Sequence, residues 1–209
     1  MGSSYSALSG ASATRHQRMV TLKGPHGARF NVLVCGPVHS GKSSFINSWH
    51  RVMAQRWGTT SDVCMTGTSG FGIVDCMTKA TSRISFPGSH GLGVIDAPHL
   101  DFTSFNTLSD ATTDVLKKLV QGVPTGFELL GKAADDIPHD PSNKIHAIIM
   151  VVDAVKLDSE GNLPYQTQVN NLAKTIRDIS PDTPWAVVAT HRADVRGSDK
   201  EVMAKVNVN

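Results

Sequence analysis

The sequence predicts a three-layer α/β fold with a mostly parallel central sheet. Three observations support this prediction: continuous apolar runs recur along the chain, helical patterns separate them, and a glycine-rich stretch links the first run to the first helix. Continuous apolar runs are typical of strands that are buried on both faces, as in a parallel sheet. Alternation of such strands with helices favours right-handed crossovers, with helices on both faces of the sheet.

Each element follows from a local pattern. The predicted strands are Phe30–Cys35, Leu92–Asp96, Ile145–Asp153 and Trp185–Thr190, with Arg83–Phe86 as a short edge strand. The predicted helices are Ser43–Arg56, Leu108–Gln121, Pro164–Ser180 and Asp199–Val206. Two segments without periodicity, Gly58–Met77 and Gly122–Asn143, are expected to be a mobile loop and an irregular connection, and loops of this length are often functional or disordered.

Composition favours one packed domain. The chain has 209 residues, of which 40% are hydrophobic and 18% are charged, so a sizeable core is expected and global disorder is not. Residues 1–18 are small and polar and are expected to form a flexible tail before a domain at 19–209. A net charge of +2 does not favour a nucleic-acid partner. Three cysteines without a C-x-x-C pair favour neither zinc nor a disulfide framework, so a reduced cytoplasmic setting is expected.

The first six residues, Met1 to Ser6, fit the pattern M-G-x-x-x-[ST] for acylation of Gly2. One acyl chain gives only marginal membrane binding, and a second signal is usually needed. The favoured alternative is an unmodified leader rich in Ser, Ala and Gly. A peripheral membrane location is therefore expected only if Gly2 is acylated.

The stretch Gly36–Ser43 fits G-x-x-x-x-G-K-S, the phosphate-binding P-loop, and it lies between a predicted strand and a predicted helix. In such a loop, backbone N–H groups and the helix N-terminus face the phosphate oxygens. Lys42 is expected to reach the β- and γ-phosphates as a catalytic group, and the Ser43 hydroxyl to bind Mg²⁺. The residues expected to contact the nucleotide here are Gly36, Val38, His39, Ser40, Gly41, Lys42, Ser43 and Ser44.

Asp96 is the predicted second magnesium ligand, because it ends an apolar strand as the Walker B aspartate does. Asp153 also ends an apolar strand and is interpreted as a structural or loop-capping residue. After Asp96, His99 stands where many GTP-binding proteins have glycine, and Leu100 stands where some have a water-orienting glutamine. Slow hydrolysis is therefore expected.

The stretch His191-Arg192-Ala193-Asp194 follows the last predicted strand and is similar to the guanine-recognition motif N/T-K-x-D. The Asp194 carboxylate would accept two hydrogen bonds from guanine, and the Arg192 guanidinium would pack on the purine face. His191 departs from the usual Asn or Thr.

The threonine that would cover Mg²⁺ and the γ-phosphate is expected between residues 58 and 81. The candidates are Thr66, Thr68, Thr78 and Thr81, and Thr78 is chosen as the catalytic one.

Three patches of the sequence resemble the interferon-induced protein 44-like GTPases. They are the P-loop region Val34–Ser48, the strand Lys144–Ala154 and the corner Thr190–Asp194, which has one residue more than the T-H-x-D turn of that family. The resemblance implies a cytoplasmic guanine-nucleotide-binding domain related to small and dynamin-like GTPases, with a protein effector or a second copy as partner. Only fifteen residues follow Asp194, so the closing strand and helix of a complete GTPase domain are not evident.

These patterns together predict a Mg²⁺-dependent GTP-binding switch with weak or partner-dependent hydrolysis. A non-hydrolysing interaction module with the same loop is the alternative, and an ATP-using NTPase is a third reading.

Overall fold

The computed structural model describes residues 29–53, 64, 80–86, 91–96, 110–129, 131–159, 162–195 and 198–206. Its centre is a five-stranded sheet with the strand order β2-β3-β1-β4-β5. The strands are β1 (Phe30–Cys35), β2 (Ser82–Ser85), β3 (Leu92–Asp96), β4 (Ile145–Asp153) and β5 (Trp185–Thr190). Neighbouring strands pair in parallel except β2, which runs antiparallel to β3. The predicted mostly parallel sheet is confirmed.

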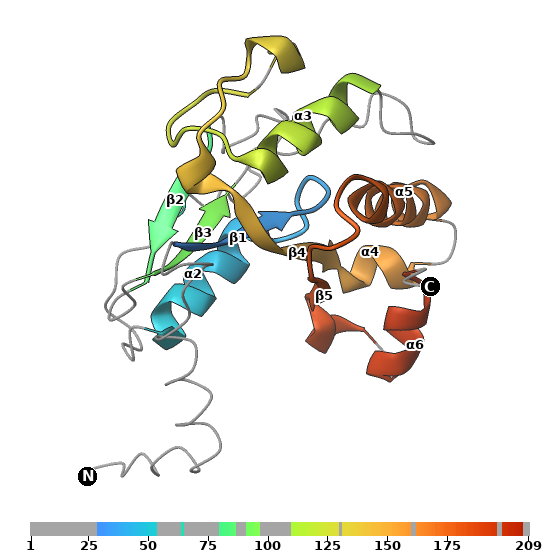
Figure 1. Ribbon diagram of the computed structural model, residues 1–209. Helices are drawn as coiled ribbons and strands as arrows, with labels where there is room; N and C mark the ends of the chain where they lie inside the picture. The colour runs from blue at the N-terminus through green and yellow to red at the C-terminus, as the bar shows by residue number, and fades with distance from the viewer. Residues whose placement is uncertain are drawn as a thin grey trace, which may run out of the picture.

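The two faces of the sheet are covered by different helices, as Figure 1 shows. Along β1, Val32 and Val34 point to the face that packs on helix α2 (Lys42–Met53). Leu33 and Cys35 point to the opposite face, which packs on α3 (Asp110–Gln121) and α5 (Leu163–Ile179). Because successive side chains of a strand alternate, an apolar run is needed to fill both cores at once. The three predicted layers are therefore present.

The predicted bounds of β1, β3, β4 and β5 are confirmed, and β2 begins and ends one residue earlier than predicted. Helix α5 also begins and ends one residue early, and α6 (Asp199–Ala204) is two residues shorter than predicted. The predicted end of the first helix at Arg56 and the predicted start of the second at Leu108 lie outside the described residues. So does the predicted tail, 1–18, with Gly2.

Helix α4 (Ala154–Asp158) was not predicted. It begins directly after β4 because the Asp153 side chain accepts hydrogen bonds from the backbone N–H groups of Val155 and Lys156. A carboxylate at this position satisfies N–H groups that have no partner within the helix. The interpretation of Asp153 as a capping residue is confirmed.

The connection between α3 and β4 is irregular, as predicted, but it is packed. It contains two short 3₁₀ turns, η2 (Ala134–Asp136) and η3 (Pro141–Asn143). Leu129 and Ile137 are buried in the same core as α3. The backbone N–H of Thr81, just before β2, donates to the Phe127 carbonyl oxygen at 3.0 Å. In the part of the chain that the structure describes, no helix has the length and apolarity needed to cross a membrane.

Candidate functional site

The predicted phosphate-binding loop lies at the carboxyl edge of the sheet, between the end of β1 and the start of α2. Three strands end at the same edge with polar residues, namely Asp96, Asp153 and Thr190. The registers place Asp96 opposite Val34 and Asp153 opposite Thr190. In open α/β sheets, this edge is where ligands bind.

Both glycines of the loop are required by its backbone. Gly36 has φ +149°, and a Cβ atom there would collide with the Val151 carbonyl oxygen of β4. Gly41 has φ +85°, and a Cβ atom there would lie 3.1 Å from Thr190 Cγ2. Residues with a side chain rarely adopt such positive φ values, so glycine is the residue that fits at both positions without strain. The loop is thus packed tightly against the ends of β4 and β5.

Lys42 folds back over the loop. Its Nζ donates hydrogen bonds to the carbonyl oxygens of Pro37 at 2.9 Å and Gly36 at 3.1 Å. This places an ammonium group beside the loop, at the N-terminus of a twelve-residue helix whose first turn holds no acidic side chain. Both features favour an anion at this position. Burial raises the pKa of the neighbouring Cys35 thiol to about 12, partly offset by the charge of Lys42, so this thiol stays protonated and serves packing.

Ser40 is fully buried in the loop, yet its hydroxyl oxygen has no hydrogen-bond partner among the described residues. Its backbone carbonyl oxygen, by contrast, accepts a hydrogen bond from the Thr190 hydroxyl at 2.7 Å. An unsatisfied buried hydroxyl is costly and needs an explanation. A phosphate oxygen at the loop would give it a partner.

The donor set for the predicted magnesium ion consists of the Ser43 hydroxyl and the Asp96 carboxylate. Ser43 is half-buried in the first turn of α2, and Asp96 is 2% exposed at the end of β3. Mg²⁺ in nucleotide sites takes one or two protein oxygens and completes its shell with phosphates and water. Two hard oxygen donors therefore fit this ion, although no group of three or more His, Cys, Asp or Glu side chains gathers around a metal position in the described chain.

The predicted base-recognition residues follow β5 in a short 3₁₀ turn, η4 (Arg192–Asp194). His191 has a left-handed backbone with φ +53°, and Asp194 is exposed. The Arg192 Nη1 atom donates to the Val195 carbonyl oxygen at 2.8 Å and closes the turn. The structure thus brings these three residues to the same edge as the loop.

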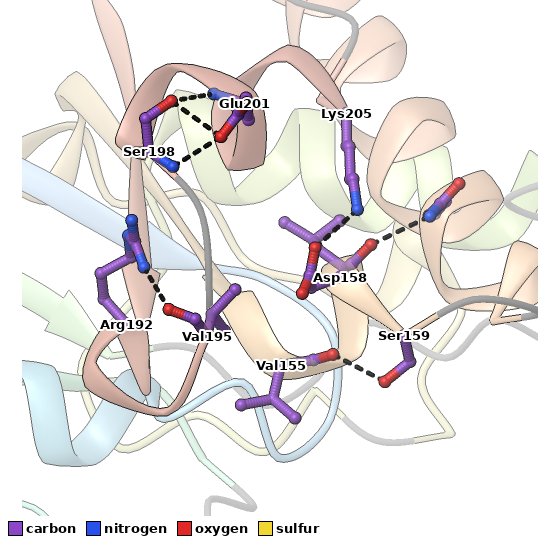
Figure 2. A network of polar contacts seen from close by, with 10 residues as sticks. Val155, Asp158, Ser159, Arg192, Val195, Ser198, Glu201 and Lys205 are labelled. Carbon is purple, nitrogen blue, oxygen red and sulfur yellow. Dashed lines mark hydrogen bonds and ion pairs between the residues drawn. The ribbon is translucent and has the colours of Figure 1, made fainter.

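Polar contacts stabilise the η4 turn and, separately, helix α6, as Figure 2 shows. Ser198 and Glu201 form a reciprocal cap at the start of α6, since each side chain bonds to the backbone N–H of the other. Lys205, after α6, forms an ion pair with Asp158 of α4 at 2.7 Å. Helix α4 thus lies against both the η4 turn and α6.

The remaining candidates are resolved only in part. The Thr81 hydroxyl is buried and donates to the Pro124 carbonyl oxygen at 2.8 Å, so this threonine serves structure and not a metal. Thr66, Thr68 and the chosen Thr78 lie outside the described residues, as do His99 and Leu100.

The sequence patterns gave no role to two polar residues near the loop, Thr190 and Asn47, although both lie in the patches that resemble the interferon-induced protein 44-like GTPases. Thr190, at the end of β5, binds the Ser40 carbonyl oxygen from 150 positions away. Asn47 on α2 exchanges two hydrogen bonds with the backbone of Cys64, at 2.9 and 3.0 Å. This side chain fixes one point of the segment after α2, and it lies five residues beyond the lysine of the loop.

No family model matches the chain, and no curated protein matches it. Among solved structures, one similar chain is described as a probable GTP-binding protein engB, with 16% identity, a TM-score of 0.46, and coverage of 86% of this chain and 82% of that one. Another comes from the signal recognition particle receptor SRb-GTP/SRX complex of Chaetomium thermophilum, with 14% identity, a TM-score of 0.37, and coverage of 84% and 77%. Both similarities are too weak to transfer chemistry to this chain.

Proposed function

We propose that this chain binds a guanine nucleotide together with Mg²⁺ and acts as a switch that hydrolyses GTP slowly. One observation carries the proposal. The Gly36–Ser43 loop is folded as an anion cradle at the N-terminus of α2, with the Lys42 ammonium drawn over it and the buried Ser40 hydroxyl left without a partner among the described residues.

Different groups of the loop would contact different parts of the bound nucleotide. Lys42 neutralises the β- and γ-phosphates, and the loop N–H groups orient them. Ser43 and Asp96 hold Mg²⁺, which supplies charge stabilisation when bound. We keep Thr78 as the residue that covers the γ-phosphate. Positioning and charge stabilisation are the main protein contributions to phosphoryl transfer, so this donor set is sufficient for slow turnover.

Guanine is the base that the η4 turn suits best. The exposed Asp194 carboxylate can accept two hydrogen bonds from the N1–H and the exocyclic amine of guanine, which adenine does not offer as a pair. Arg192 and His191 flank that carboxylate at the end of β5. An ATP-using enzyme is the less favoured reading for this reason.

A non-hydrolysing nucleotide-dependent interaction module is the second candidate function. His99 and Leu100 favour it, because they stand where a flexible glycine and a water-orienting glutamine occur in other GTP-binding proteins. In this case the nucleotide would set the conformation of an interaction surface, and turnover would need a partner to supply the missing groups.

We further propose kinship with the interferon-induced protein 44-like GTPases, on the sequence patches Val34–Ser48, Lys144–Ala154 and Thr190–Asp194. A cytoplasmic location and a protein effector or second copy as partner go with that proposal. Peripheral membrane binding goes with acylation of Gly2, which mass spectrometry of the intact chain from eukaryotic cells would detect.

Two linked measurements test the proposed function. Calorimetric titrations with GTP, GDP and ATP, each with Mg²⁺, should show tighter binding of the guanine nucleotides, and phosphate release from GTP should be slow but above the buffer rate. Tighter ATP binding would overturn the guanine assignment. GTP binding without any release would select the interaction module. Asp194→Asn should relax the preference for GTP over ATP, whereas the control Asp182→Asn, in the turn before β5, should leave it unchanged.

A further inference from the structure

The residue after β5, His191, is held by a carboxylate from the neighbouring strand. Its Nδ1 atom lies 3.3 Å from Asp153 Oδ2, and the two residues leave the sheet side by side because Asp153 pairs with Thr190 in the register. The Asp153 side chain is 8% exposed and that of His191 is 53% exposed. The buried Asp153 carboxylate thus contacts one nitrogen of the half-exposed His191 ring.

Asp153 is itself fixed at three points. Its Oδ1 accepts from the N–H groups of Val155 and Lys156 at the start of α4. Its own N–H donates to the hydroxyl of the buried Tyr165 at 2.7 Å. Only Oδ2 is left to face His191, so the carboxylate has one orientation and the imidazole is held by a rigid partner.

This contact favours one position of the imidazole proton. A carboxylate accepts hydrogen bonds and does not donate them, so the ionised Asp153 favours the tautomer of His191 that carries the proton on Nδ1. In the neutral ring, Nε2 then carries a lone pair and is a hydrogen-bond acceptor.

The backbone around His191 is strained in the same way as the loop. Among the described residues, the non-glycine residues with positive φ are His191, at +53°, and His39 of the Gly36–Ser43 loop, at +56°. Such conformations cost energy and cluster at binding sites. The preceding residue, Thr190, touches the loop directly through the Ser40 carbonyl oxygen. The ring is therefore anchored at the mouth of the proposed nucleotide site.

We infer that Asp153 is a positioning residue for nucleotide recognition, which orients His191 so that Nε2 accepts a hydrogen bond from a donor group of the nucleoside. The donor is either a ribose hydroxyl or the exocyclic amine of guanine, since each presents an O–H or N–H to an acceptor. The inference rests on the proposed function, and it assigns to Asp153 a second role beyond the cap of α4.

The substitution Asp153→Asn tests this directly. Asparagine caps helices about as well as aspartate, so its oxygen is expected to stay on the Val155 and Lys156 N–H groups. Its amide N–H₂ then faces His191 Nδ1 as a donor, which moves the imidazole proton to Nε2 and converts that atom from acceptor to donor. Asp158→Asn is the matched control, because Asp158 ends α4, the helix that Asp153 caps, and pairs with Lys205.

The primary measurement is GTP affinity by calorimetry with Mg²⁺. Asp153→Asn is expected to weaken binding about tenfold, the value of one well-placed hydrogen bond that becomes a donor–donor contact. Asp158→Asn is expected to leave binding unchanged. His191→Gly, which fits the left-handed backbone, should lose as much affinity as Asp153→Asn, and the double variant should be no weaker than His191→Gly alone. Wild-type affinity in Asp153→Asn, or additive losses in the double variant, would overturn the inference.

Two further readouts separate the possible failures. Nitrogen NMR of the imidazole should show the proton on Nδ1 in the wild type and on Nε2 in Asp153→Asn, and identical tautomers would contradict the assignment. Inosine triphosphate and 2′-deoxy-GTP, which lack the amine and the hydroxyl respectively, identify the donor: one of them should bind the wild type about tenfold more weakly than GTP and be indifferent to Asp153→Asn. If both match GTP, the inference fails while the proposed function stands. If the wild type does not bind GTP at all, both fail.

Discussion

Two buried polar residues at opposite ends of the central sheet, Asn31 and Ser40, differ in their hydrogen bonding. At the amino edge, the fully buried Asn31 of β1 has its polar groups bonded: its N–H donates to His146 Nδ1 at 3.1 Å, its amide donates to the carbonyl oxygens of Ser142 and Lys144, and its Oδ1 accepts from Arg83 Nε at 3.0 Å. At the carboxyl edge, the buried Ser40 hydroxyl has no partner among the described residues. The bonds of Asn31 stabilise the fold, whereas the Ser40 hydroxyl would donate to a phosphate oxygen bound at the loop.

Positive φ values occur at both edges, since Gly122 has φ +113° beside Asp140 and Lys144, just before β4 begins. His39 and His191, with positive φ, both lie at the carboxyl edge, and so do Gly36 and Gly41. At the amino edge, the register between β1 and β4 shifts next to Asn31, and His146 Nδ1 accepts the hydrogen bond from the Asn31 N–H. Among the described non-glycine residues, backbone strain is therefore found where the phosphates are expected.

The largest effect on stability is expected at the carboxyl edge, at Gly36. Gly36→Ala would place a methyl group against the Val151 carbonyl oxygen and would hold an alanine at a backbone φ of +149°. The free energy of unfolding should therefore fall by more than about 3 kcal/mol. Urea unfolding measures this loss. Gly126→Ala is the control, because φ there is +83° but nothing lies within 4 Å of the added carbon. Equal losses in the two variants would show that crowding by β4 has no part in the effect.

A loss of stability without a loss of binding is expected at the amino edge. Asn31→Ala leaves two backbone carbonyl oxygens and the Arg83 guanidinium short of a partner, so unfolding should become easier by about 2–4 kcal/mol. GTP affinity of the folded protein should stay within about twofold of wild type, because this edge holds no nucleotide. The control Ser85→Ala removes only an exposed acceptor of the same guanidinium and should change stability by less than about 0.5 kcal/mol. If Asn31→Ala lost as much free energy of GTP binding as free energy of unfolding, the proposed difference between the two edges would be wrong.

A smaller, pH-dependent effect is expected from His146. Burial, and then the charge of Lys144, lower its pKa below the usual 6.5, and Nδ1 must be unprotonated to accept the Asn31 N–H. The folded state therefore binds fewer protons than the unfolded state, and stability from this residue is present above pH 6.5 and lost as the pH falls through the lowered pKa. In His146→Asn, whose Oδ1 replaces Nδ1 as acceptor, the fall in stability between about pH 7 and about pH 5 should be shallower. His139→Asn, at an exposed site, is the control, and an equal slope in wild type and His146→Asn would rule this origin out.

Much of the fold could be predicted because the parallel strands are continuous apolar runs, most of them buried inside the sheet, with β5 at its partly exposed edge. Continuous apolar runs marked β1, β3, β4 and β5 to the residue, whereas the edge strand β2, with a mixed pattern, was displaced by one position. Helix α4 was not predicted because its five residues are too few to show a helical periodicity, although its cap, Asp153, was interpreted as a structural or loop-capping residue.

The site could be predicted only where its residues are adjacent in sequence. The Gly36–Ser43 loop is a local motif, so its residues and their order were readable. The bond from Thr190 to Ser40, the pairing of Asp153 with His191, and the Asn47–Cys64 contacts depend on which strands and helices become neighbours in space. Long-range contacts of this kind leave no periodic trace in one sequence.

The central claim is that the loop at the carboxyl edge binds the phosphates of a nucleotide through Lys42. Calorimetric titration of Mg²⁺ and GTP into wild type, Lys42→Ala and the exposed control Lys132→Ala tests it most directly. Wild type and Lys132→Ala should bind alike, and Lys42→Ala should lose about a hundredfold or more, in keeping with removal of a charge-assisted contact to phosphate. Equal affinity in Lys42→Ala and wild type, or no binding by the wild type, would contradict the claim.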